Sequence, residues 1–129
     1  ALVLGEKAAA ALEALQRVDF VYLHIEAPDE AGHEGNCGLK TRCIEDIDQK
    51  VVKPILEACL ASAEPFTVAL LPDHPTPCSV RTHTYDPVPF VIFTPGTEPD
   101  GVDRYDENSA EQGSFGLLHN GEFFRLLFP

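Results

Sequence analysis

The sequence places Pro72-Asp73-His74-Pro75-Thr76-Pro77 directly after the apolar run Val68-Ala69-Leu70-Leu71. The short apolar run predicts a buried strand, and the prolines predict that this strand ends just before Asp73. Neighbouring side chains on a straight strand point to opposite faces, but the chain turns at a strand's last residue, so both side chains can converge there. A carboxylate beside an imidazole in such a place is typical of ligands for a divalent metal.

Helical and strand patterns alternate on both sides of this stretch. Apolar residues spaced three and four apart predict helices at residues 5–17 and 38–61, with a bend or break at Pro54. Short runs of branched and aromatic residues predict further strands at residues 18–25 and 87–93. The alternation indicates an α/β domain with a mainly parallel sheet flanked by helices.

The remaining segments connect or close this domain. Proline, glycine and acidic residues predict a surface loop at 94–108, and residues 121–128 suit a short final helix. We found no internal repeat, so residues 1–129 are treated as one domain. The chain begins at Ala1 and has no methionine, and we therefore expect it to be a piece of something longer.

Composition and charge exclude several classes of protein. An apolar content of 44% is enough for a core, and no run is long enough for a transmembrane helix, so we expect a cytoplasmic protein without a membrane partner. Twenty-one acidic against nine basic residues give a net charge of −12, which argues against nucleic-acid binding. An acidic protein also repels anionic substrates unless metal ions reverse the local field.

The cysteines predict neither a disulfide scaffold nor a zinc site. The four of them, Cys37, Cys43, Cys59 and Cys78, show no C-x-x-C spacing, which fits a reducing cytosol. We interpret them individually as packing residues.

Five residues of metal-ligand type follow predicted strands: Asp29, His33, Asp73, His74 and His83. Asp29 and His33 are four apart, so one helical turn places them on the same side, and ligands in α/β sheets gather beyond the carboxyl ends of the strands. Each residue alone has a structural alternative, since a loop histidine is often only solvated and an aspartate can cap a turn or helix. Together they predict a metal site.

Other polar residues suit plainer roles. His24 lies inside a predicted strand and is interpreted as structural, and His119 has no evident partner. Lys40 and Arg81 are the basic residues nearest in sequence to the predicted ligands. Either could contact an anionic substrate or lie on the surface.

Several of these motifs together resemble a known family. The D-x-x-x-H element, the D-H pair and the H-T-x-x-P-V-P element lie in residues 19–35, 71–77 and 81–90, and residues 44–48 add a further match. These stretches closely resemble the archaeal-type cofactor-independent phosphoglycerate mutases, which belong to the alkaline phosphatase superfamily. The resemblance covers nearly the whole chain and implies the carboxyl-terminal half of the phosphatase-like domain.

The resemblance implies two divalent metal ions (manganese, zinc or magnesium), no organic cofactor, and a serine or threonine nucleophile. Asp29 and His33 would bind one metal together with His83, and Asp73 and His74 would bind the other. In the family, the nucleophile and a further aspartate come from an amino-terminal segment, and most substrate-binding residues come from an inserted domain. We therefore expect the catalytic nucleophile to lie outside this chain. The substrate-binding residues within this chain are unknown.

The implied reaction of a parent protein is the interconversion of 2-phosphoglycerate and 3-phosphoglycerate through a phosphoenzyme, with the present chain inactive alone. Two alternatives stay open. One is a metal-dependent phosphomonoester or phosphonate hydrolase of the same superfamily. The other is a non-catalytic fragment that folds and forms homo-oligomers through an exposed sheet edge.

Overall fold

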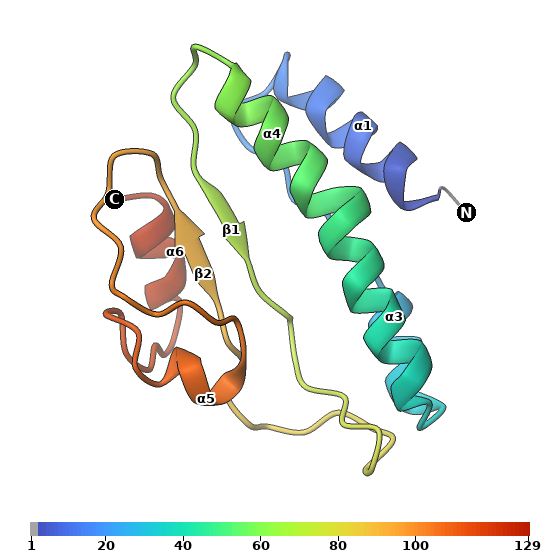
Figure 1. The fold of residues 1–129 in the computed structure, drawn as a ribbon. Helices are drawn as coiled ribbons and strands as arrows, with labels where there is room; N and C mark the ends of the chain where they lie inside the picture. The colour runs from blue at the N-terminus through green and yellow to red at the C-terminus, as the bar shows by residue number, and fades with distance from the viewer. Residues whose placement is uncertain (1–2) are drawn as a thin grey trace. The chain divides into compact units, whose positions relative to one another are not determined.

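The structure, a computed structural model, describes residues 3–129 (Figure 1). The chain divides into two compact units. The first comprises Ala1–Glu64 and Thr76–His83, and the second comprises Pro65–Pro75 and Thr84–Pro129. Among the described residues, no helix has the length and apolar character needed to cross a membrane.

Helix α1, Leu4–Leu15, forms one layer of the first unit and confirms the helix predicted there. Its sequence is rich in alanine, leucine and glutamate, which favour helix. Ala8 and Ala11 are buried on α1, which packs against both α4 (Lys53–Ala61) and the π-helical turn η1 (Asp48–Val52) before it (Figure 1). Small side chains allow two helices to approach closely, so this contact forms much of the unit's core.

The predicted helix over residues 38–61 forms as three joined pieces: α3 (Cys37–Ile47), the π-helical turn η1 (Asp48–Val52) and α4 (Lys53–Ala61). The side chain of Asn36 caps α3 by accepting a hydrogen bond from the Leu39 backbone N–H at 3.0 Å. The irregularity expected at Pro54 is this π-helical turn. Proline lacks an N–H and its ring crowds the carbonyl four residues earlier, and the wider turn relieves that clash.

The prediction of a strand at residues 18–25 is wrong for this chain. The segment is extended but belongs to no sheet in the part of the chain that the structure describes. Tyr22 is 72% exposed and Phe20 49% exposed, so neither side chain is buried. An extended segment becomes a strand only when another strand takes up its N–H and C=O groups, and sequence periodicity does not report whether that neighbour is present.

The second unit holds a two-stranded sheet of β1 (Val68–Leu70) and β2 (Val91–Phe93). Both strands were predicted, although β2 is shorter than expected. They pair antiparallel, with Val68 opposite Phe93, so the predicted mainly parallel sheet is not confirmed. A parallel pair needs a crossover, usually a helix, and residues 71–90 contain none.

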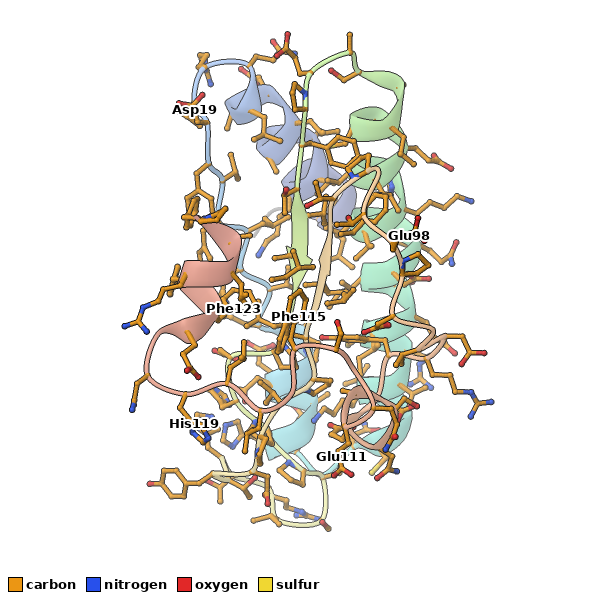
Figure 2. All side chains as sticks on the ribbon, turned by 90° about the vertical axis from the view of Figure 1, so that its left-hand side faces the viewer. Asp19, Glu98, Glu111, Phe115, His119 and Phe123 are labelled. Carbon is orange, nitrogen blue, oxygen red and sulfur yellow. The ribbon has the colours of Figure 1, made fainter. Side chains whose placement is uncertain are left out.

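Two short helices complete the second unit: α5 (Glu107–Ala110), which begins at the end of the predicted loop and extends past it, and α6 (Glu122–Leu127), the predicted final helix. Phe90 contacts both Phe115 and Phe123, at ring-centroid distances of 5.8 and 5.4 Å. Phe115 and Phe123 are labelled in Figure 2. The Tyr105 hydroxyl donates to the Pro89 carbonyl at 3.1 Å, and burial raises the pKa of Tyr105 to about 12. These contacts form a small aromatic cluster, in which Phe115 remains 45% exposed.

Helix α2, Ala27–His33, contacts α3 and the segment 76–83, both within the first unit. Ala31 and Gly32 are its buried residues. A Cβ atom added at Gly32 would lie 2.4 Å from the Thr76 carbonyl oxygen and 2.9 Å from Thr76 Cγ2. The glycine is therefore what allows α2 to approach the segment so closely.

We predict that Gly32→Ala destabilises the chain by about 1–3 kcal/mol, because the added methyl group overpacks a backbone contact that cannot yield without moving α2. Urea denaturation followed by circular dichroism measures the free energy of unfolding. Gly5→Ala is the matched control, since nothing lies within 4 Å of its added Cβ. Equal stability of Gly32→Ala and the unaltered chain would contradict the described contact.

Candidate metal centre

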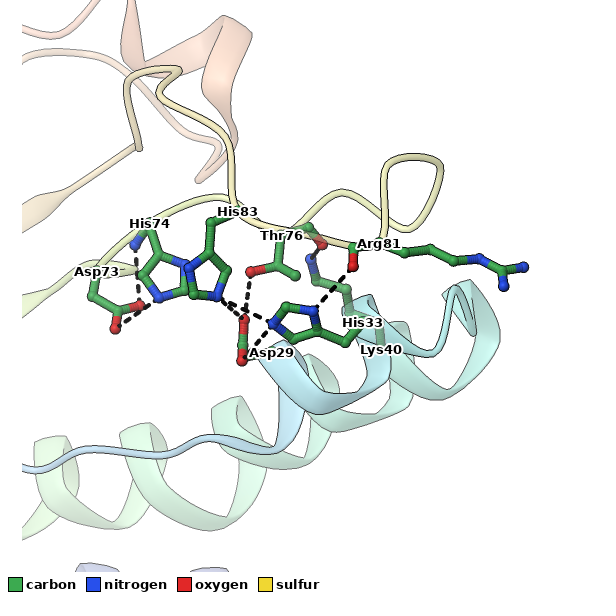
Figure 3. Close-up of polar contacts among 8 residues, drawn as sticks. All are labelled: Asp29, His33, Lys40, Asp73, His74, Thr76, Arg81 and His83. Atoms are coloured by element: carbon green, nitrogen blue, oxygen red, sulfur yellow. Dashed lines mark hydrogen bonds and ion pairs between the residues drawn. The ribbon is translucent and has the colours of Figure 1, made fainter.

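Helix α2 carries the first two predicted ligands. Pro28 lies in its first turn, where the missing N–H costs no helical hydrogen bond. Asp29 and His33 are four residues apart, so their side chains stand on the same side of the helix (Figure 3). The four-residue spacing suggested one helical turn, and the structure has that turn as part of a short helix.

The segment 76–83 brings His83 to these two residues. A tight turn opens it, in which the backbone N–H groups of Val80 and Arg81 both donate to the Pro77 carbonyl, at 3.0 and 2.8 Å. Arg81 then has φ of 60°, in the left-handed region that non-glycine residues seldom adopt. This conformation directs the Arg81 carbonyl toward α2 and places His83 beside Asp29.

Three potential ligand groups converge at this place. The Nε2 atoms of His33 and His83 are 3.2 Å apart. His33 Nε2 lies 3.4 Å from Asp29 Oδ2, and His83 Nε2 lies 3.3 Å from Asp29 Oδ1 (Figure 3). One potential ligand atom from each residue lies within 4.8 Å of the other two. The spacing is close enough for one cation to contact all three after small side-chain movements.

The backbone selects the tautomer of His33. Its Nδ1 lies 3.0 Å from the Arg81 carbonyl oxygen, which can only accept a hydrogen bond. In the neutral ring Nδ1 therefore carries the proton, and Nε2 then has a lone pair that faces Asp29 and His83. Metal-binding histidines typically donate their other ring N–H to a carbonyl or carboxylate in this way.

Exposure and charge also suit a divalent ion. The side chains of Asp29, His33 and His83 are 36%, 42% and 50% exposed, so the group is accessible from solvent. One carboxylate and two neutral imidazoles give a single negative charge and three strong ligand atoms, a donor set that zinc and manganese accept. The residues present therefore fit a metal ion and leave room for additional ligands.

Asp73 and His74 lie in the second unit, just beyond β1. Asp73 Oδ1 accepts the His74 backbone N–H at 3.0 Å, and Asp73 Oδ2 lies 3.3 Å from His74 Nε2. Both residues line a cleft in that unit together with Tyr85 and Phe123. The turn after the strand does bring the two side chains together. That they bind a second metal ion remains a prediction.

The basic residues near the predicted ligands make structural contacts. Lys40 donates from Nζ to the Thr76 carbonyl oxygen at 2.7 Å. The Arg81 side chain crosses Gly35 so closely that a Cβ there would lie 2.5 Å from Arg81 Nε, and Gly35 itself has φ of 70°. The Lys40 contact thus helps to hold segment 76–83 against α3, while the exposed Arg81 side chain lies against Gly35.

The remaining candidates lie elsewhere. His24 is exposed and stacks on Tyr22, and its backbone carbonyl accepts a hydrogen bond from Lys7. The prediction that His24 lies inside a strand is therefore wrong. His119 is exposed near α6.

Cys37 is exposed, so it is not a packing residue as predicted. Its thiol hydrogen-bonds with that of Cys78, which raises the pKa of Cys78.

Two features of the site escaped the sequence-based prediction. The first is the Arg81 carbonyl, a backbone group for which side-chain chemistry gives no signal. The second is Thr76, whose hydroxyl donates to Asp29 Oδ1. The only indication of a role for Thr76 in the sequence is its position two residues after the D-H pair. That position does not reveal a contact with Asp29, 47 residues earlier.

Comparison with known proteins gives consistent results. Residues 4–124 match the family described as the Metalloenzyme superfamily. The 2,3-bisphosphoglycerate-independent phosphoglycerate mutase of Methanosarcina acetivorans is 52% identical over 122 residues, which are 94% of this chain and 31% of that protein. A probable enzyme of the same name from Geobacter sulfurreducens is 49% identical, again over 94% of this chain and 30% of that protein.

A solved structure agrees with the fold. The PH0037 protein from Pyrococcus horikoshii superposes with a TM-score of 0.88 at 34% identity, over 96% of this chain and 37% of that one. The chain therefore spans about a third of the length of its curated relatives. The family resemblance expected from the D-x-x-x-H, D-H and H-T motifs is confirmed, and the chain belongs to the Metalloenzyme superfamily.

Proposed function

We propose that these residues serve as the metal-binding, carboxyl-terminal part of a longer cofactor-independent phosphoglycerate mutase that interconverts 2-phosphoglycerate and 3-phosphoglycerate. The observation that carries the proposal is the convergence of Asp29, His33 and His83 on one point. The names of relatives that are about half identical over nearly the whole chain support the reaction. We place the reaction in the cytoplasm, with a small phosphorylated molecule as substrate and without an organic cofactor.

Each residue of the triad has a defined task. The Asp29 carboxylate offsets part of the charge of a bound cation, and the imidazoles of His33 and His83 fix the geometry without adding charge. Asp73 and His74 would hold a second ion together with groups from outside this chain. Two divalent ions, as manganese, zinc or magnesium, would neutralise phosphate oxygens and lower the pKa of a hydroxyl nucleophile.

This arrangement explains how an acidic chain could act on an anion. With a net charge of −12, the protein repels a phosphorylated substrate over most of its surface. A divalent cation on the triad would turn its local charge from minus one to plus one. The serine or threonine that takes up the phosphoryl group is expected in the part of the longer protein that this chain does not contain.

A hydrolase is the second candidate, because metal-binding aspartates and histidines suit phosphomonoester or phosphonate hydrolysis equally well. The two outcomes differ in what accepts the phosphoryl group: the other hydroxyl of the glycerate in a mutase, and water in a hydrolase. The names of the relatives favour the mutase.

A non-catalytic state is proposed for the 129 residues by themselves. The extended segment 18–25 exposes Phe20 and Tyr22, which gives an isolated chain an apolar surface for self-association. We expect no turnover by this chain alone even with manganese, because it offers no nucleophile that we can assign.

We predict that the longer protein converts 3-phosphoglycerate to 2-phosphoglycerate and that chelation of its metal abolishes the reaction. Phosphorus NMR distinguishes both esters from free phosphate in one experiment. The isolated chain with manganese, run in parallel, should show neither product.

Free phosphate as the sole product would favour the hydrolase and contradict the mutase. Turnover by the isolated chain would contradict the proposal that its nucleophile lies elsewhere.

We predict that the isolated chain binds one Mn²⁺ weakly, and that His33→Ala lowers the affinity by at least about tenfold because it removes a ligand whose tautomer the backbone has already selected. Isothermal titration calorimetry measures both dissociation constants. His24→Ala is the matched control, since that histidine is exposed and stacks only on Tyr22 among the ring contacts described. Equal affinities of His33→Ala and the unaltered chain would remove His33 from the metal site.

A further inference from the structure

Thr76 is the one polar residue among residues 3–129 that is buried, with 3% of its surface exposed. Burying a hydroxyl group is unfavourable unless it makes a hydrogen bond. The Thr76 hydroxyl donates to Asp29 Oδ1, and the Thr76 carbonyl oxygen accepts a hydrogen bond from Lys40 Nζ at 2.7 Å (Figure 3). The burial is therefore compensated on both the side chain and the backbone.

The hydroxyl contact acts on the orientation of a predicted metal ligand. An ionised carboxylate only accepts hydrogen bonds, so Thr76 must be the donor. The same oxygen, Asp29 Oδ1, lies 3.3 Å from His83 Nε2, while the other oxygen faces His33 Nε2 at 3.4 Å. Rotation of the carboxylate would change both distances, and the hydrogen bond to Thr76 opposes that rotation.

Thr76 itself is held in place by parts of the first unit. Lys40 reaches it from α3, and Gly32 of α2 lies against its backbone with no space for a side chain. Because contacts from two helices already restrict the Thr76 backbone, forming the hydrogen bond to Asp29 costs little further conformational entropy. Thr76 can therefore orient Asp29 better than a flexible surface residue could.

Segment 76–83 thus supplies three parts of one site. It contributes His83 as a potential ligand, the Arg81 carbonyl that selects the tautomer of His33, and the Thr76 hydroxyl that orients Asp29. Each of the two potential ligands on α2 has a hydrogen-bonding partner on this segment.

We propose that Thr76 is a positioning residue, whose hydroxyl orients the Asp29 carboxylate for a divalent cation held by the triad. The inference rests on the proposed metal site and adds to it a residue that does not itself contact the ion. Removal of the hydroxyl should leave all three ligands present but weaken their combined hold on the cation. Partners of this kind typically change metal affinity by about 10- to 100-fold.

The test is Mn²⁺ titration calorimetry on the unaltered chain, Thr76→Val and Thr76→Ser. Valine keeps the shape and removes the donor, so its dissociation constant should rise by about 10- to 100-fold. Serine keeps the donor and loses only a methyl group, so it should restore affinity to within about threefold of the unaltered chain. The Co²⁺ absorption spectrum gives a second readout, because its bands depend on coordination geometry, and it should change for valine and not for serine.

Thr41→Val is the matched control, since the Thr41 hydroxyl donates to the Cys37 carbonyl and not to a ligand. If Thr76→Val does not unfold cooperatively in urea, Thr76→Ala, which removes the hydroxyl and the methyl group together, takes its place.

The possible outcomes separate the two claims. Suppose that the unaltered chain binds Mn²⁺ and that a folded variant without the hydroxyl keeps the same affinity and the same Co²⁺ spectrum. This result would overturn the role of Thr76 but would not contradict the metal site. Serine failing to restore affinity would also overturn it. No binding by the unaltered chain would overturn the metal site itself, and this role with it.

Discussion

The docking of segment 76–83 on helix α2 is the interaction on which the candidate site depends. It brings His83 within 3.3 Å of Asp29, although the two residues lie 54 positions apart in the sequence. Two local features permit it: Gly32 leaves no side chain between helix and segment, and Arg81 adopts a left-handed conformation that presents its carbonyl to His33. The backbone, more than the ligand side chains, thus sets the geometry of the triad.

The same arrangement reconciles the charge of the chain with its proposed substrate. Twenty-one acidic residues oppose the approach of a phosphate group, and Lys40, a basic residue near the triad, donates its hydrogen bond to the Thr76 backbone. A divalent cation is then the most direct way to create positive potential at this point. The triad brings only one negative charge to such an ion, so much of the ion's charge would remain available to a phosphate.

Local patterns in the sequence predicted much of the molecule. The spacing of apolar residues located α1 and the long helix containing Pro54, and side-chain chemistry identified Asp29, His33 and His83 before their distances were known. Features that depend on distant partners escaped prediction. Residues 18–25 have the composition of a strand but lie outside any described sheet, and the strands that do pair are antiparallel. Likewise, no local pattern reveals that Thr76 donates to Asp29.

The most direct test of the central claim is a crystal structure of this chain grown with Mn²⁺, with anomalous scattering used to locate the ion. The account predicts an anomalous peak about 2.0–2.3 Å from an Asp29 carboxylate oxygen and from Nε2 of both His33 and His83, with His33 Nδ1 still bonded to the Arg81 carbonyl. An ion coordinated by His33 through Nδ1, or an ion that binds elsewhere and leaves the triad empty at saturating Mn²⁺, would contradict it.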